Sequence, residues 1–257
     1  MIVAESICGI CDGTGWKIVE RAGLSGAERC ECYASRRAES IKENAGIPSN
    51  YAHATLRTFA LPSDNPVSRA YLSQVLSLVS GYAREFPNVD PPGLLLVGDT
   101  GTGKTHLAIG ALKAIIEKEF EGLFFDYQNL LDRIRAGFDI ASGSSDREAY
   151  RSALDAEVLL LDDLGACRAM DWVEDTVASI ITYRCNHRKP LIATTNLPDD
   201  AVTGPIPLYK DASGQPVNKK TLAETIGLRA RSRLFEMCRV VKMPAVGDYR
   251  ISTRATR

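Results

Sequence analysis

Long apolar runs are missing from this sequence. No stretch approaches about 18 consecutive apolar residues, so a membrane-spanning helix is not expected. The first residues, MIVAESICGICDG, lack the basic region and apolar run of a secretory signal, and we expect a cytoplasmic protein with reduced cysteines. Internal repeats and low-complexity tracts are also absent, which excludes a repeat architecture.

Net charge is nearly absent as well. The formal net charge is −1, so bulk charge does not identify a nucleic-acid-binding protein. Only residues 229–257 are locally basic, and such an end can contact phosphate or be a solvated tail. The 257 residues, 45% of them hydrophobic and 25% charged, suffice for one large α/β domain with a small appendage.

Short apolar runs alternate with helical patterns along most of the chain. The runs lie at 94–97, 122–127, 157–165 and 190–196, and a last strand is expected at 239–243. This alternation predicts a parallel sheet with helices on both faces. Apolar residues at three- and four-residue steps predict an amphipathic helix over 67–86. Before it, 47–66 is expected to be an irregular connector, and 199–219, rich in Pro, Gly and Asp, a long exposed loop.

A glycine-rich loop follows the first of these strands. It fits the pattern G-x-x-x-x-G-K-[ST] and consists of Gly98, Asp99, Thr100, Gly101, Thr102, Gly103, Lys104 and Thr105. Glycines let backbone N–H groups turn toward phosphate oxygens, and the following helix N-terminus adds partial positive charge. Lys104 can reach the β- and γ-phosphates, and the Thr105 hydroxyl can bind Mg²⁺. The motif predicts a nucleotide site.

Two carboxylates end the strand in EVLLLDDLG. Asp162 fits a role in holding Mg²⁺, directly or through water, and Asp163 fits the base or water-orienting role in phosphoryl transfer. The next strand, PLIATTN, ends in Thr194, Thr195 and Asn196. This polar tip can hold the attacking water or the γ-phosphate.

These motifs, with the arginine-rich GLRARSRL and the terminal DYR, resemble the AAA+ ATPases of the DnaC/DnaI helicase-loader and IstB transposition-helper group. The similarity covers about residues 48–257. It implies an α/β fold of the ASCE P-loop type, with a five-stranded parallel sheet sandwiched by helices. The P-loop strand is expected to be central and separated from the Walker B strand by one other strand. The resemblance also implies ATP hydrolysis, with Mg²⁺, within an oligomer.

The resemblance assigns further roles by position. Asn196 matches sensor 1, Arg233 matches the arginine finger that acts on a neighbouring subunit's ATP, and Arg250 matches the sensor 2 arginine. A planar, permanently charged guanidinium suits both arginine posts because it can stabilise γ-phosphate charge. Arg229 and Arg231 lie close by and are alternative fingers. Asp163 departs from the Glu usual in AAA+ proteins, and 199–219 is longer than the family's link.

Four of the seven cysteines lie in the first 32 residues. Cys8-x-x-Cys11 and Cys30-x-Cys32 supply four thiolates, which predicts a structural Zn²⁺ site in residues 1–47, apart from an ATPase domain at 48–257. An iron–sulfur cluster uses the same ligands. Disulfides are disfavoured in the cytoplasm, and no thioredoxin-like βαβ pattern supports a redox dithiol. The segment looks like the N-terminal zinc-binding piece of some DnaC-like proteins.

The resemblance implies contact with single-stranded DNA at about 127–154. Phosphate contacts are expected from four arginines and base stacking from two aromatics, namely Arg133, Arg135, Arg147, Arg151, Phe138 and Tyr150. Acidic residues balance the local charge there. The leading hypothesis is an ATP-dependent loader of a hexameric replicative helicase, self-associating through Arg233. Alternatives are an IstB-like transposition helper, a small-molecule or nucleoside kinase, and a nucleotide switch that does not hydrolyse ATP.

Overall fold

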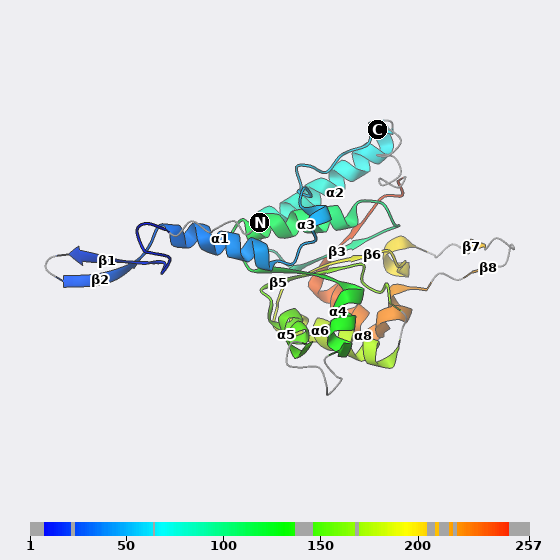
Figure 1. The fold of residues 1–257 in the computed structure, drawn as a ribbon. Coiled ribbons are helices and arrows are strands. Elements are labelled where there is room, and N and C mark those ends of the chain that lie inside the picture. Colours follow the sequence, from blue (N-terminus) through cyan, green and yellow to red (C-terminus); the bar gives the residue numbers. More distant parts are fainter. Residues whose placement is uncertain are drawn as a thin grey trace.

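A five-stranded parallel sheet lies at the centre of the molecule (Figure 1). The computed structural model describes residues 8–21, 24–63, 65–136, 146–167, 170–204, 209–210, 216–217 and 220–246. The strands are β3 (Gly93–Val97), β4 (Gly122–Asp126), β5 (Val158–Asp162), β6 (Leu191–Thr195) and β9 (Cys238–Lys242). Each arises from one of the apolar runs, and the predicted parallel sheet is confirmed.

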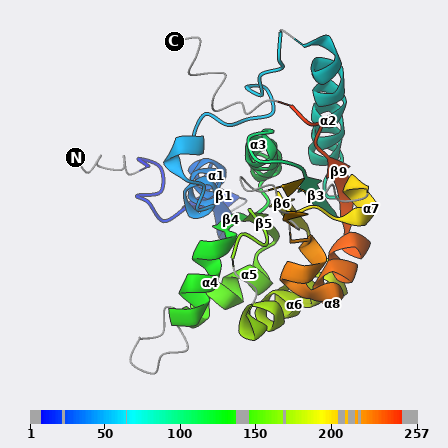
Figure 2. The ribbon, with the colours of Figure 1, turned by 90° about the vertical axis from the view of Figure 1, so that its right-hand side faces the viewer.

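Helices cover both faces of the sheet, and each face has its own core (Figure 2). Because side chains alternate along a strand, Leu94 and Leu96 of β3 pack on one side and Leu95 and Val97 on the other. The first layer consists of α1 (Cys32–Asn44), α2 (Pro66–Glu85) and α3 (Lys104–Ile116). The second consists of α4 (Tyr127–Ala136), α5 (Asp146–Asp155), α6 (Asp171–Asn186) and α8 (Leu222–Met237).

The strand order is β4-β5-β6-β3-β9. As expected, one strand, β6, separates β3 from β5. The expectation that β3 is central is wrong, because only β9 lies beyond it and the middle position belongs to β6. The carboxyl ends of β3, β5 and β6 nevertheless meet at one edge, which is where parallel α/β sheets bind ligands.

The cysteine segment forms a projecting arm (Figure 1). Its antiparallel hairpin, β1 (Trp16–Arg21) and β2 (Leu24–Arg29), lies between the two cysteine pairs and is followed by α1. Sequence patterns predicted the helix but not the hairpin. Just beyond α1, the carbonyl of Ala45 accepts a hydrogen bond of 2.7 Å from the N–H of Phe124 on edge strand β4. The base of the arm therefore covers part of that edge.

Residues 199–219 contain more structure than the predicted loop. Asp199 caps the short helix α7 (Asp200–Thr203) by accepting from the Ala201 N–H. The two-residue strands β7 (Tyr209–Lys210) and β8 (Pro216–Val217) pair in a small hairpin. In the connector, Ser49–Tyr51 forms the single-turn 3₁₀ helix η1. None of the helices in the described residues combines the length and apolar character that crossing a membrane requires.

Candidate functional site

The glycine-rich loop joins β3 to α3 at the carboxyl edge of the sheet. Gly101 and Gly103 have φ values of +79° and +90°, which side chains rarely adopt, so the loop depends on glycine there. A Cβ on Gly98 would lie 2.6 Å from the Cβ of Met243. These positions let the backbone fold back over the N-terminus of α3, the geometry that binds phosphate.

Lys104 is directed into this loop. Its side chain is largely buried, with the residue only 5% exposed, and its Nζ donates to the carbonyl of Asp99 at 2.7 Å. The Thr102 hydroxyl donates to the same carbonyl at 2.8 Å. The ammonium group is thus held within the curve of the loop, where it can meet phosphate oxygens.

Asp162 ends β5 beside the loop. Its Oδ1 accepts a hydrogen bond of 2.6 Å from the Thr194 hydroxyl, and the Thr105 side chain also bonds to it. Burial raises the pKa of Asp162 above its usual range despite the Thr194 bond, and the Asp163 charge raises it further. A divalent cation would offset the cost of this buried negative charge, so Thr105 and Asp162 fit a Mg²⁺ site.

Asp163 and Asn196 complete the far side of the site. Asp163 has a φ of +54°, and its N–H donates to the Thr194 hydroxyl at 2.9 Å. The Asn196 amide donates to the Thr100 hydroxyl at 3.4 Å. Thr194 and Thr195, expected near the water or the γ-phosphate, are fully buried, and Thr195 bonds to the Leu164 carbonyl. They hold the strand ends in place, and only Asn196 of this polar tip lines the cavity.

A cavity of about 360 Å³ joins these groups. From the predicted set it is lined by Thr100, Gly101, Gly103, Lys104, Thr105, Asp163 and Asn196. The other wall of the cavity, which no sequence motif predicts, comes from the connector and α3: Tyr51, His53, Thr58, Phe59, Ala60 and His106. The connector has no motif, and its aromatic residues alone do not distinguish it from ordinary packing.

The candidate arginines lie on or beyond α8. Arg231 makes a bidentate ion pair with the buried Asp199, with distances of 2.5 and 2.6 Å. Arg233 is partly exposed and pairs with Glu236 at 2.7 Å. Arg229 is exposed, and its side chain has no hydrogen bond or ion pair among the described residues. Neither Arg233 nor Arg229 lines the cavity of its own chain. Arg250 lies outside the described residues.

Two helices of the region expected to contact DNA, α4 and α5, pack on the sheet. Helices α4 and α5 bury Leu130, Leu131 and Ile134 from α4 and Ala149 and Ala153 from α5. The Tyr150 hydroxyl bonds with Ser179 of α6 at 2.9 Å. The guanidinium groups of Arg133 and Arg135 lie over the rings of Phe125 and Trp172. Phe138 and the Arg147 side chain lie outside the described part. Tyr150 is therefore partly buried against the second core.

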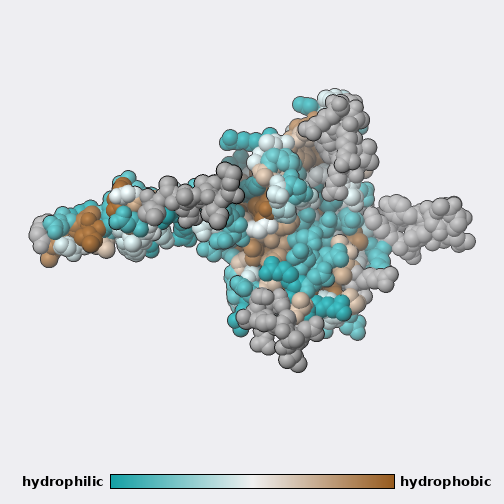
Figure 3. Space-filling view, in the orientation of Figure 1, coloured by the Kyte–Doolittle hydropathy of each residue, from teal (hydrophilic) through white to brown (hydrophobic). Residues whose placement is uncertain are grey.

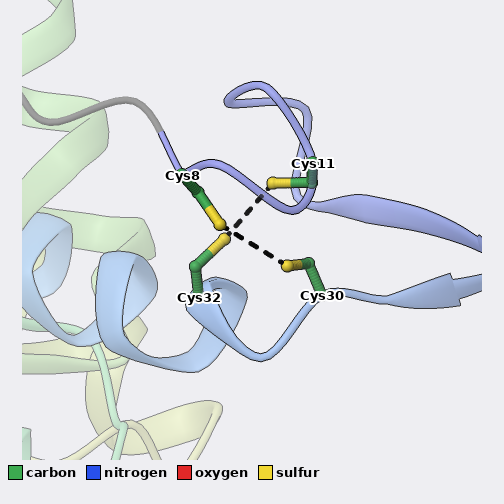
Figure 4. Close-up of side chains that lie close together, drawn as sticks. All are labelled: Cys8, Cys11, Cys30 and Cys32. Carbon is green, nitrogen blue, oxygen red and sulfur yellow. Dashed lines mark hydrogen bonds between the residues drawn. The ribbon is translucent and has the colours of Figure 1, made fainter.

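The four N-terminal cysteines converge on one point (Figure 4). Their sulfur atoms all lie within 4.8 Å of one another. Cys8 and Cys30 Sγ are 3.8 Å apart, and Cys11 and Cys32 Sγ are 3.4 Å apart. A tetrahedral ion with Zn–S bonds of about 2.3 Å separates its sulfurs by about 3.8 Å. The site thus has the size of a ZnS₄ centre, and four thiolates also suit an iron–sulfur cluster.

The backbone around the cysteines is shaped to present them. After Cys11, Asp12 and Gly13 have positive φ and turn the chain back, and the Gly15 N–H donates to Cys11 Sγ at 3.3 Å. Although burial opposes ionisation, this N–H and the neighbouring thiols lower the pKa of Cys11 to about 6. The hydrogen bond with Cys11 and burial raise the pKa of Cys32 to about 12. The negative charge of one thiolate thus opposes ionisation of the next. A metal ion would remove this opposition by binding all four cysteines as thiolates.

A larger cavity, of about 610 Å³, lies away from the nucleotide site. It is bounded by α1, the first residues of β4 and the end of α5. Its polar lining residues include Arg36, Arg37, Glu121 and Asp155. It contains neither the glycine-rich loop nor the acidic pair, so its size does not make it the nucleotide site.

Comparisons with known proteins agree with this geometry. Residues 74–202 match the model of the IstB-like ATP binding protein family. The uncharacterized protein YqaM of Bacillus subtilis is 26% identical over 186 residues, which are 68% of this chain and 56% of YqaM. The chain thus spans little more than half the length of that relative. The replicative helicase loader DnaI of Bacillus subtilis is 22% identical over 201 residues, 76% of this chain and 63% of DnaI.

A solved structure gives the same result. The crystal structure of the DnaC helicase loader is 31% identical, covers 77% of this chain and is itself covered completely, with a TM-score of 0.60. The family match, this likeness and the shared sheet together identify the group. The chain belongs to the AAA+ group of IstB-like ATP-binding proteins and DnaC/DnaI helicase loaders.

Proposed function

We propose that this protein is an ATP-dependent loader that places a hexameric replicative helicase on single-stranded DNA. The observation that carries the proposal is that one chain contains two separate structural features. One is a nucleotide cavity at the carboxyl edge of the sheet. The other is a projecting arm in which four cysteines converge (Figure 1). We assign residues 1–47 to the arm and 48–257 to the ATPase domain.

ATP hydrolysis is assigned to residues at the strand ends. Lys104 and the loop N–H groups bind the phosphates, and Thr105 with Asp162 holds the Mg²⁺ that neutralises phosphate charge. Asp163 orients the attacking water and accepts its proton, while Asn196 positions that water from the neighbouring strand. The raised pKa of the buried Asp162 supports its role as the metal-binding member of the pair.

The arm offers an apolar surface for a protein partner. Four large apolar side chains of the hairpin region are exposed, Ile10, Trp16, Ile18 and Leu24, and brown patches mark this region in Figure 3. Ile18 is 83% and Leu24 77% exposed. Exposed apolar groups gathered on so small a segment are typical of an interaction site.

A sizing-column experiment tests the partner. The protein is expected to co-elute with the replicative helicase of its host, and the complex is expected to differ between ATP and ADP. The double variant Ile18→Ser/Leu24→Ser should lose the complex because it removes apolar contact area. Val67→Ser/Tyr71→Ser, which changes exposed apolar residues on α2, is the matched control. If no complex forms in either nucleotide state, the loader proposal fails.

The second candidate is an ATP-dependent transposition helper. The match to the IstB-like family model favours it, since that model covers the glycine-rich loop, the acidic pair and four of the five strands of the sheet. Its partner would be a transposase and its DNA target a duplex. Binding to duplex rather than single-stranded DNA, with no helicase complex, supports this candidate.

Arg233 is proposed to act on the ATP of a neighbouring subunit. Arg233→Ala is expected to bind ATP with unchanged affinity but to lose at least about tenfold of the hydrolysis that rises with protein concentration, because a transition-state charge contact is removed. Turnover measured across a concentration series checks this. Arg229→Ala is the matched comparison: a loss in that variant alone moves the finger to Arg229.

A further inference from the structure

One face of α3 differs from the rest of that helix. Most of α3 has large apolar side chains, whereas the N-cap Gly103 and the helix residues His106, Gly110 and Lys113, spaced at three- and four-residue steps, do not. Residues at these steps share one side of a helix. The connector residues 51–59 lie along this side. We call this face the connector seat.

Each member of the connector seat contacts the connector. His106 Nε2 lies 2.9 Å from the carbonyl of Thr55 and 3.3 Å from the hydroxyl of Thr58. A Cβ on Gly110 would lie 2.8 Å from the backbone N of Leu56, so only glycine fits without a shift. Lys113 Nζ donates to the carbonyls of Tyr51 and Ala52, each at 2.8 Å.

The connector turn on the seat is itself well defined. Thr55 and Thr58 exchange hydrogen bonds between backbone N–H groups and hydroxyls, at 2.9 and 3.1 Å. The ring of Phe59, just after this turn, packs edge-on to the His106 ring, with centroids 5.5 Å apart. A Cβ on Gly103 would lie 2.7 Å from that Phe59 ring. The turn therefore fixes Phe59 directly against the glycine-rich loop.

The protonation of His106 follows from these contacts. A carbonyl oxygen only accepts, so Nε2 carries the proton that is donated to Thr55. His106 thus lies next to the phosphate loop in sequence but contacts the opposite wall of the cavity.

We propose that His106 is a positioning residue for the nucleoside part of ATP: by holding the connector on α3, it sets the wall formed by Tyr51, His53 and Phe59. The proposal rests on the proposed function as an ATP-binding protein. The phosphates contact the loop and Lys104, whose Nζ is held by the Asp99 carbonyl of the loop itself. The nucleoside contacts the connector wall, and aromatic rings suit a base by stacking.

Competition binding with two probes tests this proposal. His106→Ala is expected to weaken ATP binding about tenfold, because one buried hydrogen bond and its ordered wall are lost. Its affinity for inorganic tripolyphosphate with Mg²⁺ is expected to stay within about twofold of the unsubstituted protein. His106→Gln, which keeps an N–H donor, should recover most of the ATP affinity. His187→Ala, a change at an exposed histidine outside the cavity, is the matched control.

The outcomes separate this inference from the proposed function. Equal losses for ATP and tripolyphosphate, or no loss for either, overturn the positioning role. If the unsubstituted protein binds neither probe, the ATP-binding function itself fails. Gly110→Ala gives a second variant that displaces the connector without touching His106, and it should show the same selective loss of ATP affinity.

Discussion

Lys104→Ala is expected to bind ATP at least about 100-fold more weakly than the unsubstituted protein. A buried ammonium that contacts phosphate contributes charge-assisted hydrogen bonds of about 1.5–3 kcal/mol each, and every 1.4 kcal/mol is about tenfold in affinity. Lys104 is the charged side chain of the glycine-rich loop that points into its curve, with Nζ on the Asp99 carbonyl. Titration calorimetry with ATP and Mg²⁺ measures the change.

Two further variants make this result specific. Asp163→Asn should keep ATP affinity and lose hydrolysis, because it leaves the phosphate contacts but removes the proton acceptor. Lys189→Ala, which removes an ammonium bonded to the Asp155 carbonyl outside the cavity, should change neither. ATP affinity retained in Lys104→Ala would refute the nucleotide assignment of the loop. If the unsubstituted protein binds ATP but hydrolyses almost none, and Asp163→Asn leaves that low turnover unchanged, the protein is a nucleotide switch rather than an ATPase.

The double variant Cys8→Ser/Cys11→Ser is expected to lose its metal entirely. The unsubstituted protein should contain about one Zn²⁺ per chain, since four thiolates complete a structural site. A hydroxyl is a poor replacement for a thiolate, and structural Zn²⁺ contributes about 10 kcal/mol or more to the folding of small segments. Elemental analysis of both purified proteins tests this expectation.

The same variant separates the arm from the ATPase domain. Helicase binding should be lost because the hairpin is no longer held between the cysteine pairs, whereas ATP affinity should stay unchanged. Cys167→Ser/Cys185→Ser changes two cysteines outside the cluster and should retain the metal. Iron and a brown colour in place of zinc would assign an iron–sulfur cluster to the four thiolates, and no metal at all would refute the site.

The sequence predicts the parts of this molecule in which several functional residues lie close together in the chain at a fixed spacing. The glycines of the loop, the paired Asp162 and Asp163, and the cysteine pairs each need a fixed spacing, so they are visible as motifs. Buried parallel strands are equally visible, because runs such as LLLV are apolar on both faces.

The connector wall and the hairpin were not predictable in the same way. The connector has irregular backbone, and what fixes it is a set of contacts with α3, from His106 and Lys113, that are distant in sequence. The hairpin strands WKIVER and LSGAER are too short and polar to indicate strands alone, and the converging cysteines hold their ends together. Predictions from spacing also could not show that Arg231 is already bound to Asp199.

Helix α1 connects the hairpin of the arm to the edge of the sheet. Its 13 residues correspond to about 20 Å of helix, and its inner end is held to β4 by the Ala45–Phe124 hydrogen bond. The connector that leaves this inner end runs directly along the nucleotide cavity. A rotation of about 10° there would carry the outer end of α1 through roughly 3.5 Å, and the hairpin tip further. Any rotation of α1 about its anchored end would therefore be amplified at the exposed apolar side chains of the hairpin.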